Sequence, residues 1–286
     1  MDAYSIWMLE YAYAPEGPLS GLIYGAHNEG TVKVPYCYTL LKGPRHNVLV
    51  DVGYKDRGGG KAMADRAGVT NWHDPRTVLK EVGLDPIDID SIVITHAHFD
   101  HFGNVEDFPG AMFYIQEREL TRWRWASSLP SRLGWLMGAT DPDDVVRGAE
   151  LATQGRLVLV DGDKERILPG IDLFAAFDTH TFGSQFVRVH TAHGAWILAG
   201  DLVNVRENLT GRSSDGAYIP IGYAGGSQTN LLLATERMMA MVEYDHRRII
   251  PVHERRLAET FPSRVAETGL CVVEIALSDG EPSRVR

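Results

Sequence analysis

The sequence has little cysteine, no basic run and no long apolar run, and each absence excludes a class of protein. Only two cysteines, Cys37 and Cys271, occur among 286 residues, too few for a disulfide framework or a cysteine-based metal site. The 28 Lys and Arg residues are outnumbered by 38 Asp and Glu residues, so the formal net charge is −10. A surface this acidic repels phosphate backbones, and we expect no nucleic-acid partner.

No window of about 18 residues is uninterruptedly apolar, so the sequence predicts no membrane span. The first residues, Met1 to Tyr4, lack the basic and then apolar pattern of a signal peptide. The expected location is therefore the cytoplasm. Hydrophobic residues make up 44% of the chain, and its length suffices to bury a core in one large domain or two small ones.

Short apolar segments with strand character recur along the chain, separated by a few helical segments. Helices are expected to begin at Asp74-Pro75 and Asp141-Pro142, where a capping aspartate precedes a proline, and a third is expected over 229–244. Gly58-Gly59-Gly60 lacks the neighbours of a phosphate-binding loop and is interpreted as a flexible loop. The pattern indicates two packed sheets covered by helices, with strands at 36–41, 48–52, 92–95, 112–115, 157–160, 171–174, 186–189, 196–199, 248–252 and 272–277.

The strongest chemical signal is a group of ionisable side chains directly after an apolar strand. Residues 91–95 lead into His96, His98, Asp100 and His101. Imidazole and carboxylate groups are ligands of zinc, and of manganese, iron or cobalt at higher coordination numbers. Four such groups buried without a metal would be very costly, so we interpret this segment as a metal-binding loop.

Three further candidate ligands also stand where apolar segments end. They are His180, Asp201 and His253. One metal needs three or four ligands, and seven candidates therefore indicate two metals. Strand ends at one sheet edge would hold these ligands on a rigid scaffold.

The segment from Gly83 to His101, GLDPIDIDSIVITHAHFDH, resembles the metallo-β-lactamase superfamily, and most of all its branch of N-acyl homoserine lactonases and related lactone hydrolases. Similar stretches are residues 48–53, which end in Asp-x-Gly, and residues 179–181, 200–201 and 252–254. The resemblance implies an α/β (α+β) fold, namely an αββα four-layer sandwich. It also implies a single domain over residues 1–286, with a helical lid insertion at about 120–150.

The resemblance also implies a division of the ligands between two divalent ions, expected to be Zn²⁺, with manganese, iron or cobalt as alternatives. The first ion would take His96, His98 and His180, the second would take Asp100, His101 and His253, and Asp201 would bridge them. A hydroxide shared by both metals would attack the substrate, and Asp100 would carry the proton to the leaving group. Asp51 would orient a ligand histidine.

The region around the predicted site contains one departure from the lactonase pattern. Those enzymes usually carry a tyrosine shortly after the bridging aspartate, and this chain has Asn204 at that position. Asparagine can donate to an oxyanion, so Asn204 is a candidate catalytic residue. The predicted wall of the pocket consists of aromatic residues: Phe99, Phe182, Trp123 and Trp135. The tryptophans between 123 and 135 are equally well interpreted as core.

The leading functional prediction is a hydrolase that opens a lactone ring. The alternatives at the same site are hydrolysis of a cyclic amide, another ester or a halogenated aromatic compound. A different class is a metal-binding regulator or sensor without turnover, which the complete ligand set disfavours. The expected partner is a small apolar or aromatic molecule, with no membrane and no nucleic acid, and a homodimer is left open.

Overall fold

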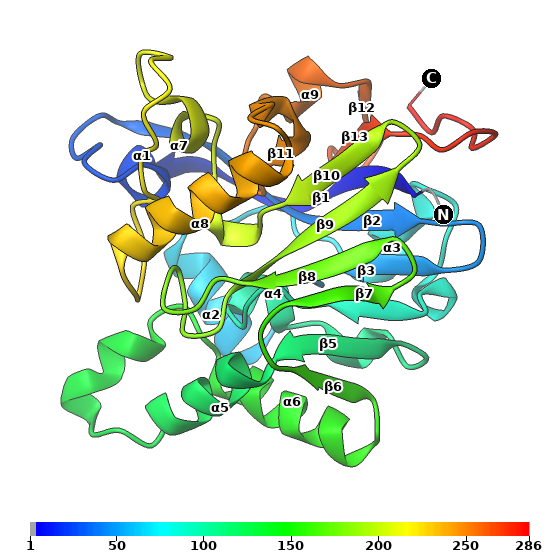
Figure 1. Cartoon of the computed structure of the whole chain (residues 1–286). Coiled ribbons are helices and arrows are strands. Elements are labelled where there is room, and N and C mark those ends of the chain that lie inside the picture. Colours follow the sequence, from blue (N-terminus) through cyan, green and yellow to red (C-terminus); the bar gives the residue numbers. More distant parts are fainter. Residues whose placement is uncertain (1–3, 286) are drawn as a thin grey trace.

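Two β-sheets pack face to face, and helices cover their outer faces, in the computed structural model of residues 4–285 (Figure 1). Met1 to Ala3, on which the expected lack of a signal peptide partly rests, lie outside the described residues. The predicted αββα sandwich is confirmed. Among the described residues, no helix is long and apolar enough to cross a membrane.

The larger sheet has the strand order β12-β13-β1-β2-β3-β4-β5-β6. β1 and β2 form a long antiparallel pair, whereas β3 to β6 run parallel to one another. The strands are β1 (Ser5–Pro18), β2 (Thr31–Lys42), β3 (Asn47–Val50), β4 (Ser91–Val93), β5 (Met112–Gln116), β6 (Leu157–Val160), β12 (Ser263–Val265) and β13 (Cys271–Ala276).

The smaller sheet has the order β11-β10-β9-β8-β7. Its strands are antiparallel except for the pair of β10 and β11. They are β7 (Lys164–Leu168), β8 (Ile171–Ala175), β9 (Gln185–Thr191), β10 (Gly194–Leu198) and β11 (Ile249–Ile250).

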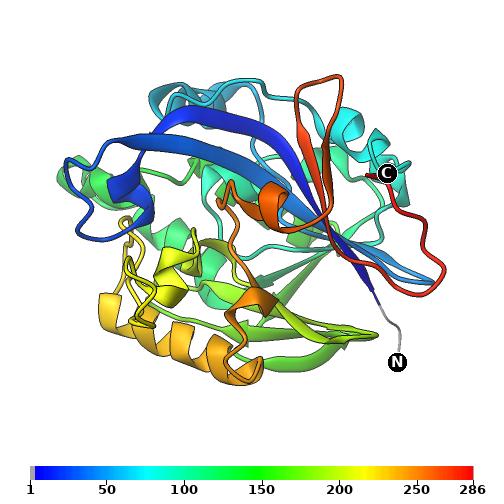
Figure 2. The same ribbon diagram turned by 90° about the horizontal axis from the view of Figure 1, so that it is seen from above.

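The helices lie on both outer faces of the sandwich. Figure 2 shows the gold helix α8 outside the smaller sheet and the cyan segment with α2 and α3 outside the larger one. As predicted, Asp74 and Asp141 cap α3 and α6 with their side chains. The helices are α1 (Leu19–Leu22), α2 (Gly58–Arg66), α3 (Pro75–Lys80), α4 (Phe99–Phe102), α5 (Glu117–Ala126), α6 (Pro142–Thr153), α7 (Glu207–Thr210), α8 (Gln228–Met241) and α9 (Leu257–Thr260).

Three hydrophobic cores fill the three interfaces between these layers. Successive side chains of a strand point to opposite faces, so Val48 and Val50 of β3 pack between the sheets while Leu49 packs under the helices. In the smaller sheet, Val187 faces the inter-sheet core and Phe186 faces α8. Strands such as β3 and β9 thus contribute to two cores, which holds their ends at fixed positions.

Two expectations about local structure are wrong, and one long strand is not predicted from the sequence. Gly58 to Gly60 form the first turn of α2 and not a flexible loop. β1 was not expected, because both of its faces are buried over residues 5–12 and no polar alternation marks it. The expected strand 248–252 is reduced to the two residues of β11.

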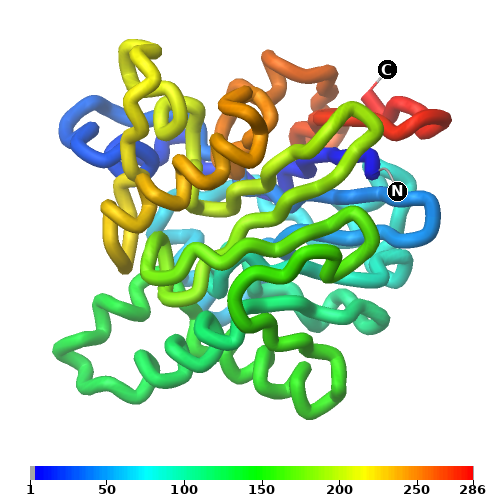
Figure 3. The backbone as a smooth tube through the Cα atoms, viewed as in Figure 1, coloured from blue at the N-terminus to red at the C-terminus, as the bar shows by residue number. Residues whose placement is uncertain are grey.

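The region of the predicted lid contains α5, a 3₁₀-helix over Ser131–Met137 (η3) and α6. Figure 3 shows the chain between α5 and α6 extending away from the two sheets. α5 and α6 contribute Leu120, Trp123 and Val145 to the core of the larger sheet, whereas η3 has no buried residue. The outer part of this region therefore rests on few packing contacts.

Candidate metal centre

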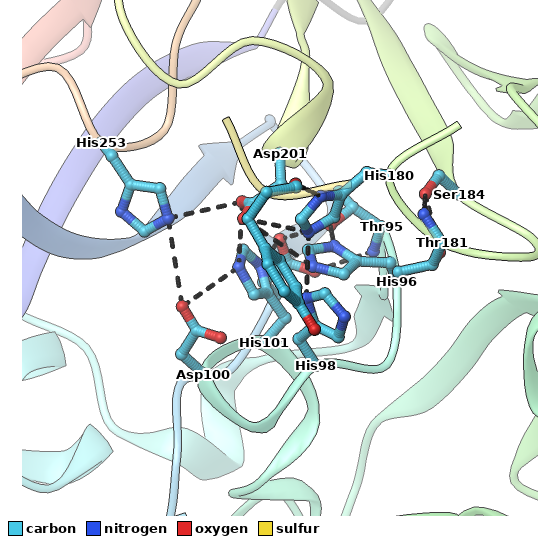
Figure 4. Close-up of polar contacts among 12 residues, drawn as sticks. Thr95, His96, His98, Asp100, His101, His180, Thr181, Ser184, Asp201 and His253 are labelled. Carbon is cyan, nitrogen blue, oxygen red and sulfur yellow. Dashed lines mark hydrogen bonds and ion pairs between the residues drawn. The ribbon is translucent and has the colours of Figure 1, made fainter. Parts of the chain in front are cut away.

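All seven predicted ligands come together at one edge of the sandwich (Figure 4). Each lies just beyond a strand: His96 and His98 after β4, Asp100 and His101 in α4, His180 after β8, Asp201 in the 3₁₀-helix Gly200–Leu202 (η4) after β10, and His253 after β11. All seven side chains are buried. The chain supplies them from four separate loops, so this grouping is a product of the sheet topology.

Asp201 lies between two groups of ligand atoms. One group comprises His96, His98, His180 and Asp201, and the other comprises Asp100, His101 and His253. Asp201 Oδ2 is 3.3 Å from His180 Nε2, while Asp201 Oδ1 is 3.1 Å from His101 Nε2 and 3.4 Å from His253 Nε2. The two carboxylate oxygens thus face different groups, as the predicted bridge requires.

Three buried atoms in this centre make no hydrogen bond, although two of them face each other at 3.1 Å. They are His96 Nε2, His101 Nε2 and Asp201 Oδ1. Buried polar atoms are almost always paired, and leaving one unpaired costs about 1–3 kcal/mol. Five imidazoles and two carboxylates form a donor set that suits Zn²⁺ or a related divalent ion. The residues therefore fit two metals.

The protonation tendencies of the centre also match a cation site. Burial, reinforced by neighbouring imidazoles, lowers the pKa of His96 and His98 well below the usual range, which leaves both rings neutral. Burial opposes a charge on His101, but the carboxylates of Asp100 and Asp201 outweigh it and raise the pKa of that ring. The carboxylates thus attract positive charge at the position where a metal ion would supply it.

Contacts outside the centre fix the orientation of three ligand rings. Asp51 Oδ2 lies 2.8 Å from His101 Nδ1, His180 Nδ1 lies 2.8 Å from the Tyr223 carbonyl, and His253 Nδ1 lies 2.8 Å from the Pro35 carbonyl. Each contact leaves the Nε2 atom of the ring turned toward the centre. Asp51 also accepts from the backbone N–H of Thr95, the residue before His96.

A cavity of about 500 Å³ opens onto the centre. It is lined by members of both groups together with Phe99, Asn204, Tyr36 and Tyr223. Asn204 is buried, and its side-chain oxygen has no hydrogen-bond partner. The structure therefore places Asn204 beside the site, where the sequence pattern predicts it.

The predicted aromatic wall divides into a buried part and an exposed part. Trp123 is 4% exposed and its ring lies against those of Phe182 and His98, whereas Trp135 is 67% exposed. Trp123, Trp135 and Phe182 line a narrow pocket next to His98 and His180. Trp123 thus belongs to the packing around the centre, and Trp135 is free to contact a ligand.

Sequence reasoning missed two tyrosines at the site. Tyr36 lies in β2 with its ring 5.2 Å from that of His253, and Tyr223 lies in the loop before α8 with its ring 5.9 Å from that of His98. Neither stands next to a ligand motif in the sequence. Only the packing of their segments against the ligand loops brings them to the cavity.

A two-sheet sandwich with a buried His/Asp centre at one edge defines a class of metal-dependent hydrolases. Within that class, residues 32–253 match the family model described as the metallo-beta-lactamase superfamily. The chain belongs to this superfamily, and the prediction of the family from the sequence is confirmed.

Two curated relatives match parts of the chain. The N-acyl homoserine lactonase AttM of Azorhizobium caulinodans is 28% identical over 100 residues, which are 32% of this chain and 38% of AttM. The probable metallo-hydrolase Rv2300c of Mycobacterium tuberculosis is 29% identical over 144 residues, which are 47% of this chain and 43% of Rv2300c. The chain matches less than half the length of each relative.

Solved structures share the fold over most of the chain. An N-acyl homoserine lactone hydrolase with the product N-hexanoyl-L-homoserine at its catalytic metal centre has a TM-score of 0.67 at 17% identity, over 91% of this chain and 97% of that chain. The dizinc quorum-quenching lactonase AidC has a TM-score of 0.58 at 17% identity, over 99% of both chains. At these identities the likeness establishes the fold.

Proposed function

We propose that this protein is a dinuclear metal-dependent hydrolase that opens the ring of a lactone. The observation that carries the proposal is the position of Asp201, whose two carboxylate oxygens face two separate groups of buried ligand atoms. A carboxylate placed in this way can bind one metal through each oxygen and so bridge two closely spaced metals. The lactonases among the relatives and structural neighbours support the choice of a cyclic ester.

When bound, two divalent ions would lower the pKa of a bound water to about 7 and polarise the substrate oxygen. The residues of this chain have separate tasks. Asp100 lines the cavity, and the imidazoles of His101 and His253 outweigh the effect of burial and lower the pKa of its carboxyl group. An ionised Asp100 can accept a proton from the attacking water and return it to the leaving alkoxide.

Asn204 is the candidate for holding the substrate oxygen as negative charge develops on it. Its backbone N–H and that of Val205 both donate to Asn208 Oδ1 at 3.0 Å. This pair of hydrogen bonds fixes the loop, so the amide group of Asn204 stays at the cavity wall. A donor that is already in place stabilises an oxyanion without reorganisation.

The substrate we propose is small and has an apolar or aromatic part. The wall of the cavity includes Phe99, Tyr36 and Tyr223, and the exposed Trp135 extends it outward on η3, within the proposed lid. A cyclic amide, another ester or a halogenated aromatic compound would meet the same groups. These are the alternatives if lactones are not turned over.

A turnover screen tests the proposal directly. The enzyme is loaded with zinc, manganese or cobalt and assayed against lactones, cyclic amides, linear esters and halogenated aromatics. We expect two metals per chain and the fastest turnover with a lactone, lost in His96→Ala. Faster turnover of another class would replace the lactone assignment, and metal binding without any turnover would favour a regulator or sensor.

A further inference from the structure

Glu119 is a fully buried carboxylate outside the seven predicted ligands. It is the third residue of α5 and is 0% exposed. An acidic side chain is almost never fully buried unless it is paired, and no cation forms an ion pair with Glu119 among the described residues. The carboxylate must therefore be satisfied by neutral donors.

Four donors surround this carboxylate, two on each oxygen. Oε1 accepts from the backbone N–H of Ala97 at 2.8 Å and from Trp123 Nε1 at 2.7 Å. Oε2 accepts from Thr181 Oγ1 at 2.8 Å and from the backbone N–H of Gly183 at 2.6 Å. Burial raises the pKa of Glu119, and these donors oppose that rise.

Three of the four donors belong to the two loops that carry the histidines of the first group. Ala97 lies between His96 and His98, and Thr181 directly follows His180. Trp123 is the third connection, because its ring lies 5.9 Å from that of His98. Two loops that are about 80 positions apart in the chain thus share one carboxylate.

The loop after His180 approaches the backbone of α5 closely, and this approach requires a glycine at position 183. A Cβ atom at Gly183 would lie 2.3 Å from the backbone nitrogen of Glu119 and 2.7 Å from its Cα. Only glycine allows the loop after His180 to come near enough for the Gly183 N–H to reach the carboxylate. The loop is therefore held at a fixed distance from α5 and from the segment His96-Ala97-His98.

We propose that Glu119 is a positioning residue that sets the distance between His180 and the pair His96 and His98, and thereby the affinity of the first metal site. The inference rests on the proposed dinuclear site. Among residues 4–285, Glu119 makes no hydrogen bond to Asp100, His101 or His253, and Asp51 and the Pro35 carbonyl orient the two rings of the second group instead. Removing the charge of Glu119 should weaken one site selectively.

Glu119→Gln is the matched change. Three of the four partners are N–H groups, which can only donate. In either orientation the NH₂ group of glutamine, also a donor, faces at least one of these N–H groups, and that pair cannot form a hydrogen bond. We expect the affinity of the first metal to fall 10- to 100-fold, the effect typical of losing a partner that orients ligands. The second metal should bind within about threefold of its wild-type affinity. Glu117→Gln, on the same helix but exposed, is the control and should change neither.

The measurement is a chelator competition with Co²⁺, followed by the visible absorption of the ion in each site. Loss of affinity and a changed spectrum at the first site alone support the proposal. Equal weakening of both sites, or no change, overturns it. If wild-type protein does not bind two metals, the proposed function fails and not this inference. Thr181→Val removes one hydrogen bond to Glu119 and should lower the affinity of the first metal site by a smaller factor. This variant tests the proposal if Glu119→Gln does not fold.

Discussion

Replacing Asn204 with leucine should decrease activity and increase stability at the same time. Asn204 is buried at the cavity wall, and its Oδ1 atom has no hydrogen-bond partner. An unpaired buried oxygen destabilises the folded state by about 1–3 kcal/mol. An apolar side chain of similar size at this position would avoid that destabilisation. Such a cost is expected where a group is kept for its function.

The two effects can be estimated separately. Losing one preorganised oxyanion donor typically costs about 2.7–4 kcal/mol of transition-state stabilisation, or about 10²- to 10³-fold in kcat. Removing the unpaired amide oxygen should stabilise the folded state by roughly 1 kcal/mol, which raises the Tm by a few degrees in a protein of this size. Asn204→Leu should therefore shift kcat and Tm in opposite directions.

The assay measures kcat, metal content and thermal unfolding of the wild type, Asn204→Leu and Asn204→Gln. Glutamine retains an amide one methylene further out, and we expect an intermediate kcat. If Asn204→Leu loses both activity and stability, Asn204 is a packing residue. If it keeps wild-type kcat with two metals bound, the substrate oxygen is not held by Asn204.

Three further predictions follow from single side chains. Asp100→Asn should lower kcat by about 10²- to 10⁴-fold with a smaller change in KM, because proton transfer acts in the transition state; near-normal kcat with full metal content would remove Asp100 from proton transfer. Burial and the nearby Asp141 raise the pKa of Asp144 to about 8, so the unfolded chain loses this proton from about pH 4 while the folded chain holds it to about pH 8. The free energy of unfolding should therefore fall through that window, and Asp144→Asn should recover roughly 2–3 kcal/mol at pH 8 but little at pH 4 in urea titrations. Trp135→Ala should raise KM for an aromatic substrate without changing the Tm, whereas Trp123→Ala should destabilise the fold by about 3–5 kcal/mol. The opposite pattern would make Trp135 the packing residue and Trp123 the substrate contact.

The layers of the fold could be predicted because strands that contribute to two cores show apolar segments with clear ends. Three strands escaped prediction. β1 contributes to two cores, but its apolar segment is interrupted by Glu10, whose charge is paired with Lys33 at 2.7 Å. β7 and β12 are the terminal strands of their sheets and are short and partly exposed, so their sequences resemble loops.

The clustering of the seven candidate ligands could be predicted because each follows an apolar strand, and strand ends of neighbouring strands share one edge. Glu119 could not be found in this way. In the sequence it is equivalent to Glu117, and both stand in the charged first turn of α5. They are two positions apart, and the turn of the helix between them points Glu117 to solvent and Glu119 to both ligand loops. The distinction depends on where α5 packs, which no local pattern encodes.

The same packing restricts which residues two positions near the centre can accept. Asp51 adopts a φ of +65°, unusual for a residue other than glycine, and this turn directs its carboxylate to Thr95 and His101. A Cβ atom at Gly200, which has a φ of +53°, would lie 2.9 Å from the side chain of Thr95, so Asp201 reaches the centre only because glycine precedes it. The carboxylate that faces both ligand groups is thus placed by contacts with the loop of the first histidines. The two sheets must therefore assemble before the centre exists, and metal binding should stabilise the assembled sandwich as a whole.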